Sequence, residues 1–164
     1  TAQSLGRYGA ELRVRPVAVP RQLDLGNVGV GISQVLPVVV LGLVSPPGSI
    51  ILLEQPELHL HPLGQQSLGD FLLALMHGGR QVVVETHSDH LVSRLRRRAA
   101  EDAASAVADR VGFLFATGRT RYRAIQPNAF GGLDDWPEGF MDQGVREAAL
   151  IIGAALDKRS SRKR

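Results

Sequence analysis

The chain has 164 residues, of which 44% are hydrophobic and 21% are charged. This balance is typical of one soluble globular domain with a sizeable core and argues against intrinsic disorder. The absence of cysteine excludes disulfides, thiolate metal sites and a thiol nucleophile, and it favours a reducing, cytoplasmic setting. The longest apolar stretch, residues 35–44, is too short to span a bilayer, so no membrane association is expected.

The net charge of +3 is small, but the basic residues are unevenly distributed. They gather in an arginine cluster, Arg94 and Arg96 to Arg98, and in a tail at residues 158–164. Such runs can neutralise the phosphates of DNA. The alternative to DNA binding is that the arginine cluster is a solvated helix face and the tail a frayed terminus. Trp136 and Phe140 are expected to pack in a core or lid rather than to stack on bases.

Strands and helices are expected to alternate along the chain. Residues 13–17 have the composition of an extended segment or edge strand. Residues 25–31 form a glycine-rich loop, and the alternative to a functional role for this loop is a simple turn. Ser33 is expected to cap an apolar helix over residues 34–43. After a Pro-Pro-Gly turn, the short apolar run at residues 50–53 predicts a strand buried on both faces.

The alternation continues in the rest of the chain. Pro62 is expected to open a helix, and a Gly-Gly pair to end it before a second short strand at residues 81–84. Ser88 or Asp89 can cap the next helix, which ends in the arginine cluster. The last elements expected are a β-hairpin of residues 111–116 and 121–125 and an amphipathic helix over residues 142–156. This order predicts an α/β fold with parallel strands at its centre and a terminal hairpin and helix.

Polar side chains gather where the two short apolar strands end. The first strand runs into Glu54, Gln55 and Glu57, and the second is followed by His87. Because strands one crossover apart can pair in parallel, these side chains are expected at one edge of the sheet, where open α/β sheets bind ligands. Carboxylates there can hold a hydrated magnesium ion, and a histidine can contact a phosphoryl group.

Two other kinds of site fit these residues less well. His59 and His61 are two residues apart, as some metal ligands are, but a chain without cysteine offers few further zinc ligands. Ser33, His87 and Asp89 contain the residue types of a hydrolase triad, yet no Gly-x-Ser-x-Gly turn surrounds the serine. A zinc site and a serine hydrolase are therefore both disfavoured.

Several segments carry a resemblance to a known family. Residues 52–62, Leu-Leu-Glu-Gln-Pro-Glu-Leu-His-Leu-His-Pro, resemble the Walker B segment and D-loop of ABC-type ATPases, and most closely those of overcoming-lysogenization-defect-like, RecF-like and SMC-like proteins. Residues 83–88 resemble the switch-histidine strand of that branch, and residues 28–34 resemble its signature loop. Residues 128–140 are similar to a C-terminal segment of bacterial ATPases in the same branch.

The resemblance implies a site for ATP and Mg²⁺. By position, Glu54 replaces the usual Walker B aspartate and would hold Mg²⁺ through water, and His87 would sense the γ-phosphate. Gln55 stands where many relatives have the catalytic glutamate, and an amide can position water but cannot accept its proton. Two alternatives follow: Glu57 replaces this base, or hydrolysis is slow.

The resemblance also implies that the glycine-rich segment acts across a dimer. Gly29, Gly31, Ser33 and Gln34 would contact the nucleotide of the opposite subunit, with backbone N–H groups donating to phosphate. The sequence contains no Gly-x-x-x-x-Gly-Lys-Ser/Thr loop, which the family places before these segments. The chain is therefore expected to be the C-terminal half of an ATPase that binds nucleotide poorly by itself.

These expectations combine into one principal function. Residues 1–126 would form the C-terminal part of an ABC-type ATPase domain, and residues 127–164 would form a further segment with the basic tail. With an N-terminal ATPase half, or as a head-to-tail homodimer, the lobe would bind and hydrolyse ATP. It would thereby drive a conformational switch linked to DNA repair, phage defence or an effector protein. The alternative is a truncated interaction module that does not hydrolyse ATP.

Overall fold

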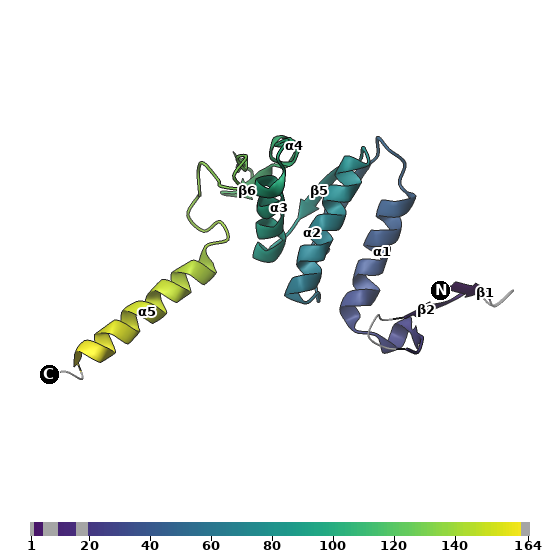
Figure 1. The fold of residues 1–164 in the computed structure, drawn as a ribbon, viewed down its shortest axis with the longest axis horizontal. Coiled ribbons are helices and arrows are strands. Elements are labelled where there is room, and N and C mark those ends of the chain that lie inside the picture. The colour runs from purple at the N-terminus through teal and green to yellow at the C-terminus, as the bar shows by residue number, and fades with distance from the viewer. Residues whose placement is uncertain (1, 5–9, 16–19, 162–164) are drawn as a thin grey trace. The chain divides into compact units, whose positions relative to one another are not determined.

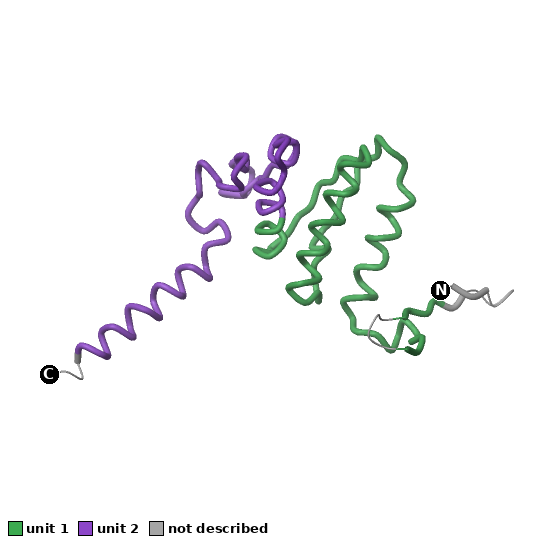
Figure 2. The backbone as a smooth tube through the Cα atoms, viewed as in Figure 1, with its two compact units in different colours: residues 1–94 green, residues 95–164 purple. Residues whose placement is uncertain are grey.

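The computed structural model describes residues 2–4, 10–15 and 20–161 (Figure 1). Residues 16 and 17 of the expected N-terminal strand and residues 162–164 of the basic tail lie outside the described residues. The chain divides into two compact units, residues 1–94 and 95–164 (Figure 2). The domain boundary expected between residues 126 and 127 stays a prediction. None of the helices in the described part combines the length and apolarity that crossing a bilayer requires.

Three short antiparallel strands open the first unit. Strand β1 (Ala2–Ser4) pairs with β2 (Ala10–Val14), and β2 pairs with β3 (Leu23–Asp24). Arg13 and Asp24 are opposite each other in the β2–β3 register, and Arg13 Nε lies 3.3 Å from Asp24 Oδ1. The strand expected near residue 13 is therefore present, and it begins three residues earlier.

Helix α1 (Val30–Val44) begins earlier than the sequence predicted. A 3-10 turn, η2 (Leu25–Asn27), takes the place of much of the expected glycine-rich loop, and Gly29 is the N-cap of α1. Ser33 therefore lies inside the helix, where its hydroxyl donates to the carbonyl oxygen of Leu25 at 3.3 Å. The prediction that Ser33 caps the helix is wrong, because the hydroxyl bonds back to the preceding turn.

The centre of the first unit is the predicted parallel β–α–β arrangement. Strands β4 (Ile50–Glu54) and β5 (Gln81–Glu85) pair in parallel, and α2 (Pro62–His77) connects them. Pro62 is the first helical residue, where its missing N–H costs nothing, and Gly78 is the C-cap. This arrangement confirms the α/β fold with parallel strands.

The parallel sheet is covered on one face. Ile51 is 3% exposed, whereas Leu52 is 71% and Ile50 is 65% exposed. The prediction of a strand buried on both faces is therefore wrong, because within the described residues nothing packs over the side that carries Leu52 and Val83. The core of this unit forms on the other side and consists of Ile51, Leu68, Leu72, Leu73, Leu75, Leu91 and Val92.

Two glycines let α1 approach its neighbours closely. A Cβ atom at Gly31 would lie 2.5 Å from the carbonyl oxygen of His59, which belongs to the segment that follows β4. A Cβ atom at Gly42 would lie 2.8 Å from side-chain atoms of Phe71 and Leu75 on α2. Side chains can rotate away from such an overlap and backbone cannot, so Gly31 sets the contact between α1 and this segment.

The second unit contains the predicted hairpin and last helix. Helix α3 (Asp89–Glu101) leads into it, and strands β6 (Phe113–Ala116) and β7 (Tyr122–Ile125) form the antiparallel hairpin. The short helix α4 (Ala106–Arg110) was not predicted, and α5 (Gln143–Ser161) extends beyond the predicted end at residue 156. The sequence therefore identified the main elements of this unit but missed its shortest helix.

Aromatic residues hold the loop before α5 against the hairpin. The Phe140 ring is buried, and its centroid lies 6.0 Å from that of Phe113, 5.5 Å from that of Phe115 and 5.7 Å from that of Trp136. The guanidinium carbon of Arg96 lies 4.8 Å from the centroid of the Trp136 ring. Trp136 and Phe140 thus pack within this unit, as predicted.

Candidate functional site

The ends of β4 and β5 bring acidic residues side by side. Glu54 and Glu85 are the last residues of the two strands and are partners in the parallel register. Both are exposed and lie on the open face, because they alternate with partly buried Leu53 and Val84. Neighbouring strands are about 4.8 Å apart, so the two carboxylates start from adjacent positions. The sequence reasoning missed Glu85, although Glu85 ends the second apolar strand as Glu54 ends the first.

The following residues complete this edge. The backbone N–H of Gln55 donates to the carbonyl oxygen of Glu85 at 2.9 Å, which extends the pairing by one step. His87 Nε2 lies 3.2 Å from Glu85 Oε1, and the His87 side chain is 79% exposed. We call Glu54, Gln55, Glu85 and His87 the carboxyl edge. Glu54, Glu85 and His87 are exposed, and Gln55 is partly buried.

Glu57 lies behind the carboxyl edge rather than on it. This residue is 6% exposed, and its Oε1 atom accepts hydrogen bonds from the Thr86 hydroxyl at 2.5 Å and from the His87 N–H at 3.0 Å. Its Oε2 atom is buried and has no hydrogen-bond partner among the described residues. The structure therefore brings together all four residues that were singled out at the strand ends, with three of them exposed or partly exposed and Glu57 buried.

Backbone strain flanks Glu57. Gln55 has a φ of 42° and His59 a φ of 61°, both in the left-handed region that side chains other than glycine rarely adopt. Each such residue costs about 1–3 kcal/mol and persists where the surrounding structure enforces it. Strained residues cluster at functional sites, so the strain here is consistent with a site at the end of β4.

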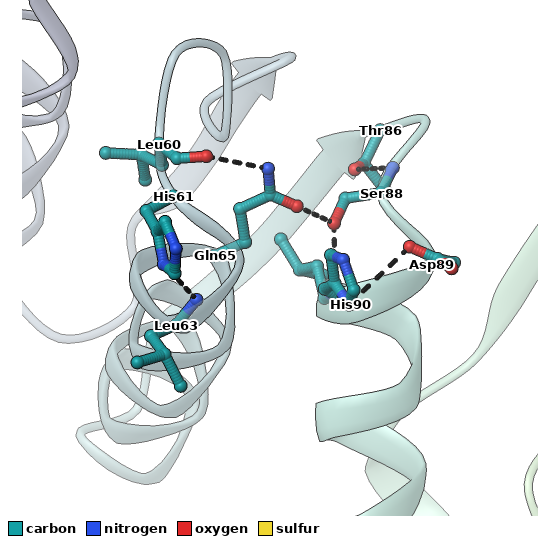
Figure 3. Close-up of polar contacts among 9 residues, drawn as sticks. Leu60, His61, Leu63, Gln65, Thr86, Ser88, Asp89 and His90 are labelled. Atoms are coloured by element: carbon teal, nitrogen blue, oxygen red, sulfur yellow. Dashed lines mark hydrogen bonds and ion pairs between the residues drawn. The ribbon is translucent and has the colours of Figure 1, made fainter.

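A second set of polar contacts joins α2 to the start of α3 (Figure 3). The Gln65 amide nitrogen donates to the Leu60 carbonyl at 2.9 Å, and Gln65 Oε1 accepts the Ser88 hydroxyl at 2.5 Å. Ser88 Oγ in turn accepts the N–H of Leu91 at 3.0 Å, so Ser88 rather than Asp89 caps α3. No sequence signal marked Gln65, because its role depends on how α2 crosses between the two strands.

The glycine-rich segment occupies the start of α1. Gly29 and Gln34 are exposed, Ser33 is partly buried, and Gly31 is buried against the His59 carbonyl. The contact between Gly31 and His59 brings this segment against residues 55–61. The roles expected for these four residues concern a nucleotide held by an opposite subunit and stay predictions.

The carboxyl edge fits a hydrated magnesium ion better than a metal held by protein ligands alone. Mg²⁺ usually keeps several waters and is bound through one or two carboxylates together with substrate phosphates. Glu54 and Glu85 supply two adjacent exposed carboxylates. Among the residues that the structure describes, no group of three or more His, Cys, Asp or Glu side chains could hold a metal ion. Any Mg²⁺ at this edge would take its remaining ligands from phosphate and water.

Comparison with protein families gives an independent result. Residues 21–93 match the family model described as "AAA domain, putative AbiEii toxin, Type IV TA system". This match supports a P-loop ATPase family. Neither a curated protein nor a solved structure matches the chain.

The matched range includes every candidate catalytic, metal-binding and nucleotide-binding residue predicted from the sequence. It runs from β3 and η2 through α1 and the β4–α2–β5 unit to the start of α3. The mixed α/β fold, with small parallel and antiparallel sheets, is compatible with a lobe of such an ATPase. An AAA-type domain indicates a nucleotide-binding, ATPase-like function, and this family generally binds nucleotide with Mg²⁺.

Proposed function

We propose that the carboxyl edge contacts the phosphates of ATP and a hydrated Mg²⁺, as part of an ABC-type ATPase of the overcoming-lysogenization-defect, RecF and SMC-like branch. The supporting observation is the parallel pairing that places Glu54 beside Glu85 and the 86–88 loop beside the end of β4. This is the end of an α/β sheet at which ligands bind. The family match over residues 21–93 supports the same reading.

The residues of the edge differ in the chemistry that they can supply. The Glu54 carboxylate is assigned to Mg²⁺ through water, and Glu85 can add a second carboxylate beside it. Gln55 can orient a water molecule but cannot accept its proton. His87 is assigned to the γ-phosphate. When bound, Mg²⁺ would neutralise charge that develops on the transferring phosphoryl group.

The rest of the nucleotide site is assigned to other polypeptide segments. A complementary ATPase half supplies the phosphate-binding loop, whose motif does not occur in these 164 residues. A second copy in a head-to-tail arrangement supplies the glycine-rich segment. The exposure of Gly29 and Gln34 supports this contact, whereas the burial of Gly31 assigns that glycine to packing.

A switch linked to DNA, defence or an effector protein remains the proposed output. The arginine cluster gives the DNA link little support, because its members already contact other groups of this chain. Arg96 Nε donates to the Gly131 carbonyl at 2.8 Å, and Arg97 and Arg98 each lie 2.7 Å from a carboxylate oxygen of Glu101. These two guanidinium groups hold the pKa of Glu101 below its ordinary value, so the carboxylate stays charged beside them.

The proposed function is tested by titrating the complete gene product with ATP, with and without Mg²⁺. We expect saturable binding that is tighter in the presence of Mg²⁺, because the carboxylates of the edge would hold the hydrated ion, whose charge would attract the phosphates. Isothermal titration calorimetry measures this binding directly. Absence of binding under both conditions would overturn the proposal.

A second candidate function, an interaction module that does not hydrolyse ATP, is favoured by α5. Asp142 precedes this helix and accepts hydrogen bonds from the Gly139 N–H and from Arg146. These donors hold the pKa of Asp142 below its ordinary value, which favours the carboxylate form at the start of α5. The large apolar side chains of α5 are all exposed: Val145 74%, Leu150 67%, Ile151 66%, Ile152 60% and Leu156 56%. Exposed apolar surface of this extent marks an interaction site.

The charges of α5 favour a second copy of the same helix as the partner. Glu147 lies in the second turn, and Lys158 and Arg159 lie in the last. In an antiparallel pair through the helix face that carries Glu147, this residue of one helix would meet Lys158 of the other, and Leu150 and Ile151 would be buried between the helices.

Charge reversal in α5 tests this pairing. Glu147→Lys alone and the double change Lys158→Glu and Arg159→Glu are each expected to weaken dimerisation by about tenfold, because each places like charges opposite one another. Combining all three changes should restore the dimer. Analytical ultracentrifugation measures the dissociation constants. A wild-type monomer, or no recovery in the combined variant, would contradict the antiparallel pair.

A further inference from the structure

We infer that Glu57 and Gln65 clamp the 86–88 loop from two sides and thereby position His87 at the carboxyl edge. Glu57 comes from the segment after β4 and Gln65 from the first turn of α2, so both belong to the connection that precedes β5. The existence of this clamp is independent of the ligand. Its importance for catalysis rests on the proposed function.

Glu57 holds the first half of the loop. One carboxylate oxygen accepts both the Thr86 hydroxyl and the backbone N–H of His87, at 2.5 and 3.0 Å. The Thr86 oxygen in turn accepts the N–H of Ser88 at 3.0 Å. Glu57 therefore holds the His87 N–H directly and the Ser88 N–H through the Thr86 hydroxyl, which fixes the backbone on both sides of the His87 side chain.

Gln65 holds the second half of the loop. Its carbonyl oxygen accepts the Ser88 hydroxyl at 2.5 Å, while its amide nitrogen is anchored on the Leu60 carbonyl at 2.9 Å (Figure 3). Ser88 is 6% exposed and also caps α3 through the Leu91 N–H. The loop is therefore fixed at Thr86 and Ser88, and the side chain between them, His87, is 79% exposed.

This geometry makes Glu57 a positioning residue rather than the general base. A base must reach the water whose proton it accepts, at about 2.6–3.2 Å. Glu57 is 6% exposed, and one of its oxygens already serves two protein donors. The other oxygen is buried as well. What Glu57 can do from this position is determine where His87 stands.

Amide hydrogen exchange without nucleotide tests the clamp in the complete gene product. Glu57→Ala is expected to speed exchange at the His87 amide by about tenfold to a hundredfold, because the amide loses its hydrogen-bond acceptor. Glu57→Gln keeps one acceptor oxygen and should stay close to wild type. Thr86→Val preserves side-chain shape and should speed exchange at the Ser88 amide. It provides the test if Glu57→Ala fails to fold.

Two adjacent glutamines provide a matched control for the other side of the clamp. Gln65→Ala is expected to speed exchange at the Ser88 and Leu91 amides, whereas Gln66→Ala, one residue along the same helix, should leave them unchanged. Unchanged exchange at His87 in Glu57→Ala, or at Ser88 in Thr86→Val, would overturn the clamp. The same conclusion would follow if Gln65→Ala and Gln66→Ala behaved alike.

ATP turnover separates positioning from base catalysis. If Glu57 acts through His87, Glu57→Ala should lower turnover in the wild-type background but not in His87→Ala, where no side chain remains to be positioned. Glu57→Gln should retain most of the activity. Additive losses, or equal losses in Glu57→Gln and Glu57→Ala, would overturn the positioning role. A gene product without turnover would count against the proposed function and leave the exchange result intact.

Discussion

Replacing Glu54 by alanine is expected to lower ATP turnover of the complete gene product by about 10- to 100-fold, the usual cost of losing a residue that holds a metal through its bound water. Glu54 ends β4 on the open face and has Glu85 beside it in the register. Its removal should leave the fold intact, because the side chain is exposed. The loss should be largest at low Mg²⁺ concentration.

The control for Glu54 is a carboxylate of equal charge that is not part of the carboxyl edge. Asp109 on α4 is exposed, and Asp109→Ala should leave turnover at the wild-type level. Steady-state turnover measured over a range of Mg²⁺ concentrations compares the two variants. Equal activity of Glu54→Ala and wild type at every concentration would remove Glu54 from the site.

Replacing Gly31 by alanine is expected to lower the free energy of unfolding by about 1–3 kcal/mol, the usual cost of overpacking a tight contact. A Cβ atom would lie 2.5 Å from the carbonyl oxygen of His59, and backbone cannot rotate away as a side chain can. His59 has a φ of 61°, so the segment that must shift is already strained. Urea denaturation measures the change.

Gly26 is the matched control for Gly31. It lies in the turn just before α1, and a Cβ atom there would meet nothing within 4 Å. Gly26→Ala should therefore change the free energy of unfolding by about 0.5 kcal/mol or less. Equal effects of the two substitutions would contradict the close approach of α1 to the segment after β4.

The order and type of the main elements could be predicted because their signals are local. Pro62 opens α2 and Gly78 closes it, and the apolar run at residues 81–84 became β5 almost without change of bounds. Two errors came from contacts that the local pattern does not encode. The Ser33 hydroxyl bonds back to Leu25 in the η2 turn instead of capping α1, and the burial of β4 depends on which elements cover its two faces.

The same distinction applies to the candidate site. The acids after β4 and the histidine after β5 were visible as residue types at strand ends, and parallel pairing brings them together. The burial of Glu57 was not visible, because it results from hydrogen bonds to residues about thirty positions away. Gln65 was missed for the same reason, since its partner Ser88 lies 23 positions later in the sequence, after β5.

The most direct test of the carboxyl edge compares substitutions at the two ends of β5. His87 follows the carboxyl end of β5, and Gln81 begins that strand and is exposed at its opposite end. Titration of the complete gene product with Mg²⁺ and ATP should show binding about tenfold weaker in His87→Ala, a loss of about 1.4 kcal/mol, and unchanged binding in Gln81→Ala. If His87→Ala binds as tightly as wild type, or Gln81→Ala weakens binding equally, the nucleotide does not bind at the carboxyl edge.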